Sequence, residues 1–466
     1  MRLPFLDFST LAARRAACER ELALNRRTAP EHYLALRRVT RNAGSGLAID
    51  GAGETVDWLV EMRRFADGAL LDEVARRGGF GVGLALRLAD QIAAFHAASE
   101  RFIDRGGGDA MAGIAAMNVD CIDEFAPAVF DPDAAAALRR DTEAALARQR
   151  GLLDRRMAEG RVRHCHGDLH LHNIFLDGDT PRLFDAIEFD DRLAQIDVMY
   201  DLAFLLMDLW HRDLKAEAAR LLSRYLLRSG DFEGLAALPL FLSLRAGIRA
   251  HVTARMADGE DGPAALHGEA RSYLALARDL LRPRRALLVG VGGLSGSGKS
   301  TFANALAPWL GRPPGAICLR SDELRKQLMG VEPEAPLPAD AYAAAVSRRV
   351  YDEMRRRAGL VLAQGYAAIA DAVQNRSQDR AALAVVADKA GTGFAGFWLE
   401  ADEATLLARV GGRSGDASDA DAAVVRKQLS QDAGTMDWHR LDAEREVAAL
   451  VEAALAVLPG ETVNRG

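Results

Sequence analysis

A glycine-rich stretch in the C-terminal part of the chain carries the residue types that bind phosphate. Residues 293–300 read GLSGSGKS and directly follow the apolar run ALLVGVG. Glycines allow backbone N–H groups to curl around phosphate oxygens, and a helix that starts at this point adds positive potential. The lysine reaches the terminal phosphates of a nucleoside triphosphate, and the serine hydroxyl is a ligand for Mg²⁺. The stretch therefore predicts ATP and Mg²⁺ as cofactors, held by Gly293, Leu294, Ser295, Gly296, Ser297, Gly298, Lys299, Ser300 and Thr301.

Two aspartates stand at the ends of later strand-like segments. Asp322 follows a segment near 316–320, where it is placed to deprotonate a substrate hydroxyl. An aspartate after a strand is also typical of a helix cap, which is the alternative interpretation. Asp371 ends a segment at 366–371 and is a candidate for holding the water shell of Mg²⁺.

Two arginines follow the aspartates. Arg409 and Arg413 stand beside a Gly/Ser/Asp-rich stretch, and arginines on a mobile lid can cover transferring phosphates and exclude water. This order of loop, aspartates and lid resembles the small-molecule P-loop kinases related to polynucleotide kinase, zeta toxins and chloramphenicol phosphotransferase. The resemblance covers about residues 286–458.

A second chemical cluster lies at residues 164–173, which read HCHGDLHLHN. Four histidines and one cysteine surround Asp168, so a zinc site is one interpretation. His170 and His172 alternate, but neither an HExxH nor a CxxC motif accompanies them. The pattern therefore favours a role for Asp168 other than in a zinc site.

The stretch HGDLHLHN resembles the catalytic loop of aminoglycoside-phosphotransferase-like kinases, which share the protein-kinase pattern of His, Asp and a later Asn. By this resemblance, Asp168 accepts the proton of a substrate hydroxyl, and Asn173, five residues on, binds a metal ion. The resemblance also implies a second metal carboxylate after a short hairpin. Asp185 stands there, with Glu188 and Asp190 as alternatives.

The neighbouring polar residues have supporting roles in this resemblance. His166 and His170 orient the loop through hydrogen bonds, while His164 and His172 flank it. In the later segment DVMYDLAFLLMDL, Asp201 braces the catalytic loop and takes no part in the chemistry.

Length and composition limit the classes of protein to consider. The 466 residues are enough for two or three domains, and 49% hydrophobic with 27% charged residues is a globular balance. A net charge of −7 offers no basic surface, so no nucleic-acid partner is expected. The apolar runs are too short to span a membrane, the N-terminus has no signal-peptide pattern, and the four cysteines lie far apart. These features predict a cytoplasmic protein with no membrane partner.

Patterns along the chain place both clusters on elements. Residues 9–25 predict a helix, residues 33–62 short strands, and residues 70–149 and 197–281 mostly helices. After RPRR at 282–285, strands and helices alternate, which favours parallel β-α-β units.

The two clusters together predict two domains. Residues 1–282 are expected to form an α+β, protein-kinase-like domain, and residues 283–466 an α/β P-loop domain with a parallel sheet. A chain that joins an aminoglycoside-phosphotransferase-like domain to a P-loop kinase resembles a group of bacterial two-kinase fusions over essentially its whole length.

The first domain departs from the kinase pattern at one position. Kinases place a strand lysine before the helix whose glutamate pairs with it. Here the helix offers Glu19 or Glu21, but no lysine occurs before Lys215, and of the residues that precede the helix only Arg2 is a cation. We therefore expect an incomplete N-lobe with an exposed sheet edge and an upstream reading frame that encodes a glycine-rich turn and a lysine, or else a degenerate kinase module.

The predicted function is ATP-dependent phosphoryl transfer to a hydroxyl group of a small molecule. One alternative is a nucleotide-gated ligand-binding protein with ATPase activity and a degenerate front module. Another is a toxin-like kinase that acts on a nucleotide sugar.

Overall fold

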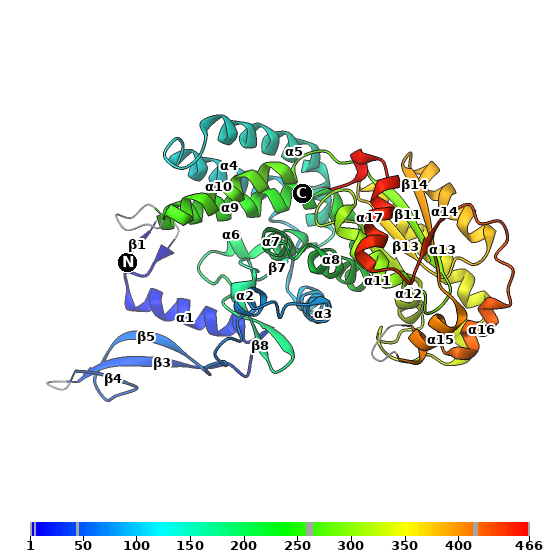
Figure 1. Cartoon of the computed structure of the whole chain (residues 1–466). Helices are drawn as coiled ribbons and strands as arrows, with labels where there is room; N and C mark the ends of the chain where they lie inside the picture. The colour runs from blue at the N-terminus through cyan, green and yellow to red at the C-terminus, as the bar shows by residue number, and fades with distance from the viewer. Residues whose placement is uncertain (1, 4–5, 43–45, 258–263, 413–417, 465–466) are drawn as a thin grey trace. The chain divides into compact units, whose positions relative to one another are not determined.

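The computed structural model describes most of the chain as helices and strands (Figure 1). The described residues are 2–3, 6–42, 46–257, 264–412 and 418–464.

The chain divides into two compact units. The first holds Met1–Arg212 and Leu240–Leu281, and the second holds Asp213–Pro239 and Arg282–Gly466. Residues 213–239 therefore belong to the second unit, although residues of the first unit precede and follow them in the sequence.

The first unit begins with a small antiparallel sheet and one helix. The sheet has the order β4-β3-β5, from β3 (Tyr33–Asn42), β4 (Gly46–Ile49) and β5 (Glu54–Met62). Helix α1 (Leu11–Asn25) packs against β5, and Thr10 caps it by accepting a hydrogen bond from the Ala13 backbone N–H at 3.1 Å. Within the described residues, the outer edges of β4 and β5 pair with no further strand. A short hairpin precedes α1, formed by β1 (Arg2–Leu3) and β2 (Leu6–Asp7).

The rest of the first unit is mostly helical and encloses two short antiparallel pairings. The helices are α2 (Leu71–Arg76), α3 (Val82–Ala98), α4 (Gly107–Glu124), α5 (Pro132–Ala158), α6 (Asp191–Ala194), α7 (Val198–His211), α9 (Leu238–Ala257) and α10 (Ala264–Leu280). The strands are β6 (Arg101–Phe102), β7 (Val162–His164) and β10 (Gln195–Asp197) in the order β10-β7-β6, and the hairpin β8 (Ile174–Asp177) with β9 (Thr180–Leu183). The cluster at 164–173 runs from the end of β7 through the 3₁₀ turn η1 (Leu171–Asn173), so a strand and a turn fix both ends of it.

The second unit is built on a five-stranded parallel sheet, as the alternation of strands and helices predicts. Its order is β12-β13-β11-β14-β15, and β11 and β13 at its centre are fully buried. The strands are β11 (Leu287–Gly293), β12 (Ile317–Arg320), β13 (Ala368–Asp371), β14 (Gly393–Glu400) and β15 (His439–Asp442).

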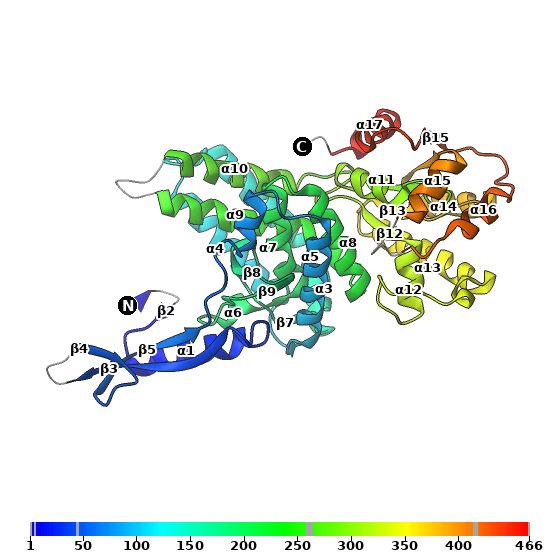
Figure 2. The same ribbon diagram turned by 60° about the horizontal axis from the view of Figure 1, so that its bottom comes forward.

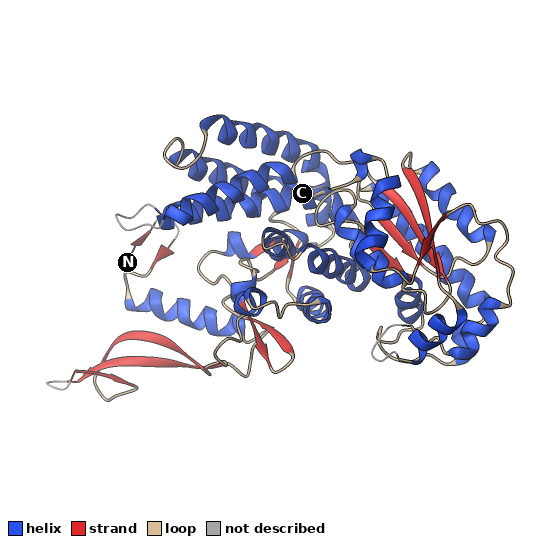
Figure 3. Cartoon of the chain, viewed as in Figure 1, coloured by secondary structure: helices blue, strands red, loops and turns tan. Residues whose placement is uncertain are grey.

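Helices cover both faces of this sheet, which explains why its central strands are apolar throughout. Helices α11 and α17 lie on one face, and α13 and α14 lie on the other (Figures 1 and 2). Figure 3 shows the strands in red between these helices. None of the described helices combines the length and the apolar character that crossing a bilayer requires. The helices after the first strand are α11 (Lys299–Leu306), α12 (Ser321–Leu328), α13 (Ala344–Ala363), α14 (Ser377–Lys389), α15 (Glu403–Gly411), α16 (Ala422–Leu429) and α17 (Val447–Val457).

Helix α8 (Lys215–Ser229) also belongs to the second unit. Ala219 joins the core of that unit, where it lies among residues of β11, α11 and β12. Ser223 Oγ accepts a hydrogen bond from the Cys318 backbone N–H of β12 at 3.1 Å. The division at 282/283 expected from the sequence differs from this arrangement, because residues 213–239 pack with the P-loop unit.

Removing the Ser223 hydroxyl should destabilise the second unit. In Ser223→Ala, the Cys318 N–H stays buried without its acceptor, which costs about 1–3 kcal/mol of unfolding free energy. Urea unfolding followed by tryptophan fluorescence measures this loss, because Trp309, Trp398 and Trp438 all lie in the second unit. The matched control is Ser430→Ala, which removes an exposed hydroxyl. Equal stability of the two variants would contradict the role of α8 in this core.

Candidate functional site

The phosphate-binding loop of the second unit joins the end of β11 to the start of α11. Its backbone requires glycine at Gly293 and Gly296, whose φ angles are 138° and 90°. An added Cβ would lie 2.6 Å from the Leu399 carbonyl oxygen at the first position and 2.6 Å from the Leu406 carbonyl oxygen at the second. The loop therefore has a backbone shape that only glycine permits, which fits a phosphate cradle.

A hydroxyl and a carboxylate meet beside this loop. Ser300 Oγ donates to Asp371 Oδ2 at 2.5 Å, because β11 and β13 are neighbours and the first turn of α11 follows β11. These hard oxygen ligands are of the type that Mg²⁺ prefers, so the pair fits the predicted ion. Lys299 Nζ donates to the Leu294 carbonyl oxygen at 2.8 Å, so the lysine side chain folds back along the loop.

A cavity of about 870 Å³ extends from the phosphate-binding loop to the start of α12. Gly298, Lys299 and Ser300 line one part of it, and Asp322 and Arg325 line another. Cavities of 300–1,000 Å³ suit small-molecule ligands and cofactors. The structure therefore brings the predicted phosphate, metal and proton-accepting residues of the second unit to one cavity.

Asp322 is a carboxylate without an ion-pair partner in the described part of the chain. Burial raises the pKa of Asp322 and the charge of Asp371 adds to this rise, although Arg320, Lys299 and Arg325 oppose it. The N-cap of α12 is Arg320, so Asp322 stands inside the first turn and does not take the capping position. This environment suits a base that receives a proton.

The predicted catalytic loop of the first unit holds Asp168 and Asn173 in contact. Asn173 Nδ2 donates to Asp168 Oδ2 at 2.9 Å and to the Asp168 carbonyl oxygen at 3.0 Å. His170 Nε2 lies 3.3 Å from Asp168 Oδ2. Burial alone would raise the pKa of Asp168, but the hydrogen bond from His170 and the positive charges of His170, His166 and Arg245 outweigh it and lower the pKa.

Asp185 follows the hairpin β8–β9 and adjoins this loop through Phe184. The Phe184 N–H donates to the Asn173 carbonyl oxygen at 3.1 Å, and the Phe184 carbonyl oxygen lies 2.8 Å from His166 Nε2. Asp185 has a φ of 61°, and its N–H donates to the Tyr33 hydroxyl at 3.2 Å.

Three carboxylates gather around this position. Burial, together with the charges of Glu188 and Asp185, raises the pKa of Glu21 on α1 to about 7. Burial raises the pKa of Glu188 as well, and the charge of Asp185 adds to the rise. Glu19, the other candidate on this helix, is exposed and pairs with Arg15 at 2.9 Å. Asp190, an alternative metal ligand in the sequence, instead caps α6 and pairs with Arg192.

Asp201 braces the loop as the resemblance implies. It is fully buried and accepts hydrogen bonds from the His166 and Gly167 backbone N–H groups at 3.1 and 2.8 Å. Its carboxylate also lies 3.1 Å from His96 Nε2. Among the described residues, the set with converging metal-ligand atoms is His96, Cys165 and Asp201, not the histidines of the zinc interpretation.

Comparisons with known proteins also divide the chain into two domains. Residues 64–238 match the phosphotransferase enzyme family, and residues 263–432 match an AAA domain. Two uncharacterised proteins, Rv2004c of Mycobacterium tuberculosis and Mb2027c of Mycobacterium bovis, are each 30% identical over 446 residues. The match covers 94% of this chain and 86% of each relative. The chain belongs to their family. The two domains matched in this chain are of kinase type, which makes this chain a phosphotransferase.

Two solved kinases resemble parts of the chain at low overall similarity. A gluconokinase from Sinorhizobium meliloti 1021 is 24% identical, covers 38% of this chain and 91% of its own, and has a TM-score of 0.26. A choline/ethanolamine kinase family protein from Mesorhizobium loti is 13% identical, covers 59% and 80%, and has a TM-score of 0.36. Likenesses this remote carry no argument about the substrate.

Of the two arginines predicted for a lid of the P-loop domain, the structure describes Arg409. Arg409 Nη2 donates to the Ala443 carbonyl oxygen at 3.0 Å, and Arg409 is not among the residues that line the cavity. Arg413 lies outside the described residues. The structure therefore does not bring Arg409 to the cavity, and the lid role of Arg413 stays a prediction.

Helix α16 contributes the side chains that the arginine pattern missed. Gln428 Oε1 accepts from the Ser295 N–H at 2.8 Å, and Gln428 Nε2 donates to Ser295 Oγ at 3.1 Å. Lys427 lines the same cavity. Asp419, ahead of this helix, accepts from the Tyr342 hydroxyl at 2.7 Å. The sequence gives no distinct signal for this segment, because its lysine–glutamine pair also occurs at 326–327.

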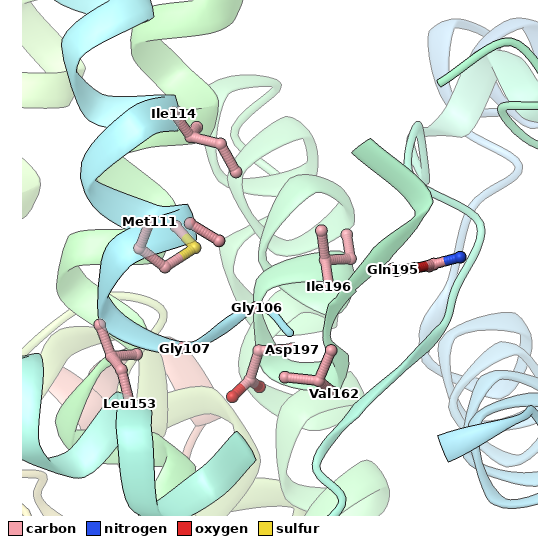
Figure 4. Close-up of a pocket in the computed structure, with 10 residues that line it drawn as sticks. Gly106, Gly107, Met111, Ile114, Leu153, Val162, Gln195, Ile196 and Asp197 are labelled. Carbon is pink, nitrogen blue, oxygen red and sulfur yellow. The ribbon is translucent and has the colours of Figure 1, made fainter. Parts of the chain in front are cut away.

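A second, very small cavity lies in the phosphotransferase unit between α4, β7 and β10 (Figure 4). Its volume is about 10 Å³, and apolar side chains such as Met111, Ile114 and Val162 line most of it. The nearby Asp197 carboxylate is paired with Arg156 at 2.7 Å. A space this size holds at most one water molecule, so this cavity is a packing gap and not a ligand site.

The raised pKa of Glu21 predicts a pH-dependent stability of the phosphotransferase unit. The native carboxyl holds its proton up to about pH 7, whereas the usual pKa is 4.5, so the unfolded chain releases the proton earlier. Glu21 therefore lowers the stability as pH rises from 4.5 to 7. In chelator and without Mg²⁺, Glu21→Gln should be more stable than the wild type at pH 8 by roughly 1 kcal/mol, after solvent screening, and about equal at pH 4.

Thermal unfolding at both pH values measures this difference. The exposed Glu19→Gln is the control, and it should change little at either pH. If Glu21→Gln changes the stability by the same amount at pH 4 and at pH 8, the pKa of Glu21 is not raised in the folded protein.

Proposed function

We propose that the P-loop unit transfers the γ-phosphoryl group of ATP to a hydroxyl group of a small molecule, with Mg²⁺ as cofactor. The observation that carries this proposal is the single cavity that contains Lys299, the Ser300–Asp371 pair and Asp322. A phosphate cradle, a metal-ligand pair and a base along one cavity are the parts that phosphoryl transfer needs.

Each residue has a distinct task in this proposal. The loop N–H groups and Lys299 bind the phosphates. Ser300 and Asp371 would hold Mg²⁺, which would supply positive charge to the phosphate oxygens. Asp322 accepts the proton of the acceptor hydroxyl. The oxygen of that hydroxyl bonds to the γ-phosphorus while the bond from the γ-phosphorus to the ADP oxygen breaks. Asp419 and Gln428 line the cavity, where their segment would limit the access of water to the phosphates.

The acceptor end of the cavity favours a negatively charged substituent. Arg325 is only 6% exposed, and no carboxylate lies within ion-pair distance of it among the described residues. Its Nη1 donates to the Ala341 carbonyl oxygen at 2.8 Å, while its buried Nε has no hydrogen-bond partner. Arg348 and Arg376 line the same cavity and are exposed. Unmatched guanidinium groups suit a carboxylate or phosphate on the acceptor.

A ligand-holding role for the phosphotransferase unit is a second candidate function. Glu21 faces Asp185 and Glu188 and makes no ion pair with any described residue, so the kinase clamp of lysine and glutamate has no counterpart there. This favours the alternative of a nucleotide-gated binding protein, in which the phosphotransferase unit holds a ligand and the P-loop unit hydrolyses or senses ATP. ATP turnover by the full chain that no hydroxylated metabolite stimulates would support that alternative.

Asp322→Asn should keep ATP binding and lose phosphoryl transfer by about 10²–10⁴-fold, because the amide keeps the size but not the basicity. Lys299→Ala should weaken both, because a phosphate-facing charge is lost. The measurements are calorimetric titration with a non-hydrolysable ATP analogue and transfer from γ-labelled ATP into a metabolite extract by the full chain. Asp388→Asn, at an exposed position of α14 that does not line the cavity, is the control. Normal transfer by Asp322→Asn would reduce Asp322 to a structural residue.

Arg325→Met should raise the KM for the acceptor by about tenfold or more, because a charge-assisted hydrogen bond is worth about 1.5–3 kcal/mol. The KM for ATP should stay nearly constant. The test splits the extract by anion exchange, and phosphorylated product should form from the retained, anionic fraction. Product that forms from the unretained fraction would rule out an anionic acceptor. No product from either fraction would overturn phosphoryl transfer itself.

A further inference from the structure

Helix α8 presents a row of arginines to the P-loop unit to which it belongs. Arg220, Arg224 and Arg228 are four residues apart, so they project from one face of the helix. The first two are buried, with side chains 2% and 1% exposed, and the third is 28% exposed. Fully buried arginines are rare unless carboxylates match their charge.

The matching carboxylate is Glu323, the residue next to the proposed base. Both Glu323 oxygens receive hydrogen bonds from Arg220, one of them from Nη1 at 3.4 Å. Arg224 Nη1 lies 3.8 Å from Glu323 Oε1, and Arg320 Nη1 lies 3.7 Å from the same atom. Glu323 is therefore shared between two arginines of α8 and one at the end of β12.

Arg320 connects this cluster to the metal-ligand pair. Its Nε lies 3.5 Å from Asp371 Oδ2, the oxygen that accepts the Ser300 hydrogen bond at 2.5 Å. A continuous series of polar contacts thus runs from Arg220 through Glu323, Arg320 and Asp371 to the phosphate-binding loop.

The balance of charge in this series explains why a change at Arg220 would affect Arg320. Arg224 also pairs with Glu334 at 3.1 Å, so Arg220 is the closest match for the charge of Glu323. Without Arg220, the buried Glu323 would draw Arg320 toward itself and away from Asp371, because an uncompensated buried charge is costly. The first turn of α12, which carries Asp322, would shift with it.

We propose that Arg220 is a positioning residue of the P-loop site: it neutralises Glu323 and so leaves Arg320 to hold Asp371. This inference rests on the proposed function, since it assigns a task within the same site. Residues 64–238, which match the phosphotransferase family, include α8. The P-loop site is therefore completed by a helix that lies within the phosphotransferase match in the sequence but packs in the second unit in the structure.

A merely structural role of α8 makes a different prediction. It would lower activity only in proportion to the folded fraction, and no second change would restore it. A positioning role predicts loss of kcat in folded protein and recovery when the charge of Glu323 is removed as well.

The test uses the full chain and four variants. Arg220→Met should lower kcat for Mg²⁺-ATP turnover by about tenfold or more in protein that is folded by circular dichroism. Its affinity for a non-hydrolysable ATP analogue should stay within about threefold, because Lys299 and the backbone N–H groups that bind the phosphates are not members of the series. The combined change Arg220→Met with Glu323→Gln should return kcat to within about threefold of the wild type. Arg220→Lys, which keeps the charge, should lose less than Arg220→Met.

Arg228→Met is the matched control. Arg228 stands on the same face of α8 but pairs with Glu332 at 2.5 Å, outside the series, so its kcat should equal that of the wild type. Unchanged kcat in Arg220→Met overturns the proposal, and so does a loss that the combined change fails to recover. If Arg220→Met does not fold, full activity of Arg220→Lys together with an inactive combined variant also overturns it. A wild-type chain without any ATP turnover would instead overturn the proposed function.

Discussion

The carboxyl ends of β11, β12 and β13 meet at one edge of a parallel sheet, and the candidate site of the P-loop unit depends on this arrangement. Because β13 lies between the other two strands, Val291 and Arg320 both pair in register with Asp371. The segments that follow the strands then carry Lys299, Asp322 and the cavity between them. A ligand placed at this edge meets backbone N–H groups, a base and a metal-ligand pair at once, which no single segment provides.

Buried charge keeps this edge in one geometry. Replacing a buried ion cluster with apolar residues is often neutral for stability, so the arginines around Glu323 are poorly explained as a source of stability. An ion pair differs from an apolar contact in its direction, because a guanidinium group must face its carboxylate. The cluster therefore fixes where Arg320 and the first turn of α12 lie, and the apolar core around Ala219 fixes the helix that brings Arg220 to it.

Local chemistry explains which parts of the site the sequence could predict. The phosphate-binding loop could be predicted because its glycines, lysine and serine lie close together in the sequence and follow an apolar strand. Asp371 is legible because it ends such a strand. By contrast, the membership of α8 in the P-loop unit depends on contacts with Cys318 and Glu323, roughly a hundred residues away in the chain. An amphipathic pattern predicts a helix but not the unit in which it packs.

Contacts between segments that are distant in the sequence also explain why the positions of Gln428 on α16 and Trp438 beside β14 could not be predicted. Gln428 reaches Ser295 only because α16 returns to the loop, and no spacing rule links two such distant polar residues. Trp438 packs against β14, where a Cβ on Gly396 would lie 2.3 Å from its ring. A glycine within a strand predicts a close approach, but it does not name the side chain that approaches.

The two units differ in the charge of the side chains that gather at their candidate sites. In the P-loop unit, lysine and arginine side chains line the cavity, and Asp322 is a carboxylate with no cation in ion-pair contact among the described residues. In the phosphotransferase unit, Glu21, Asp185 and Glu188 lie together, and burial with mutual repulsion keeps Glu21 protonated up to about pH 7. A triphosphate adds negative charge, so it finds attraction in the first case and repulsion in the second. An ATP molecule bound beside these carboxylates would therefore need cations to offset their charge, whereas the lining lysine and arginine side chains do so in the P-loop unit.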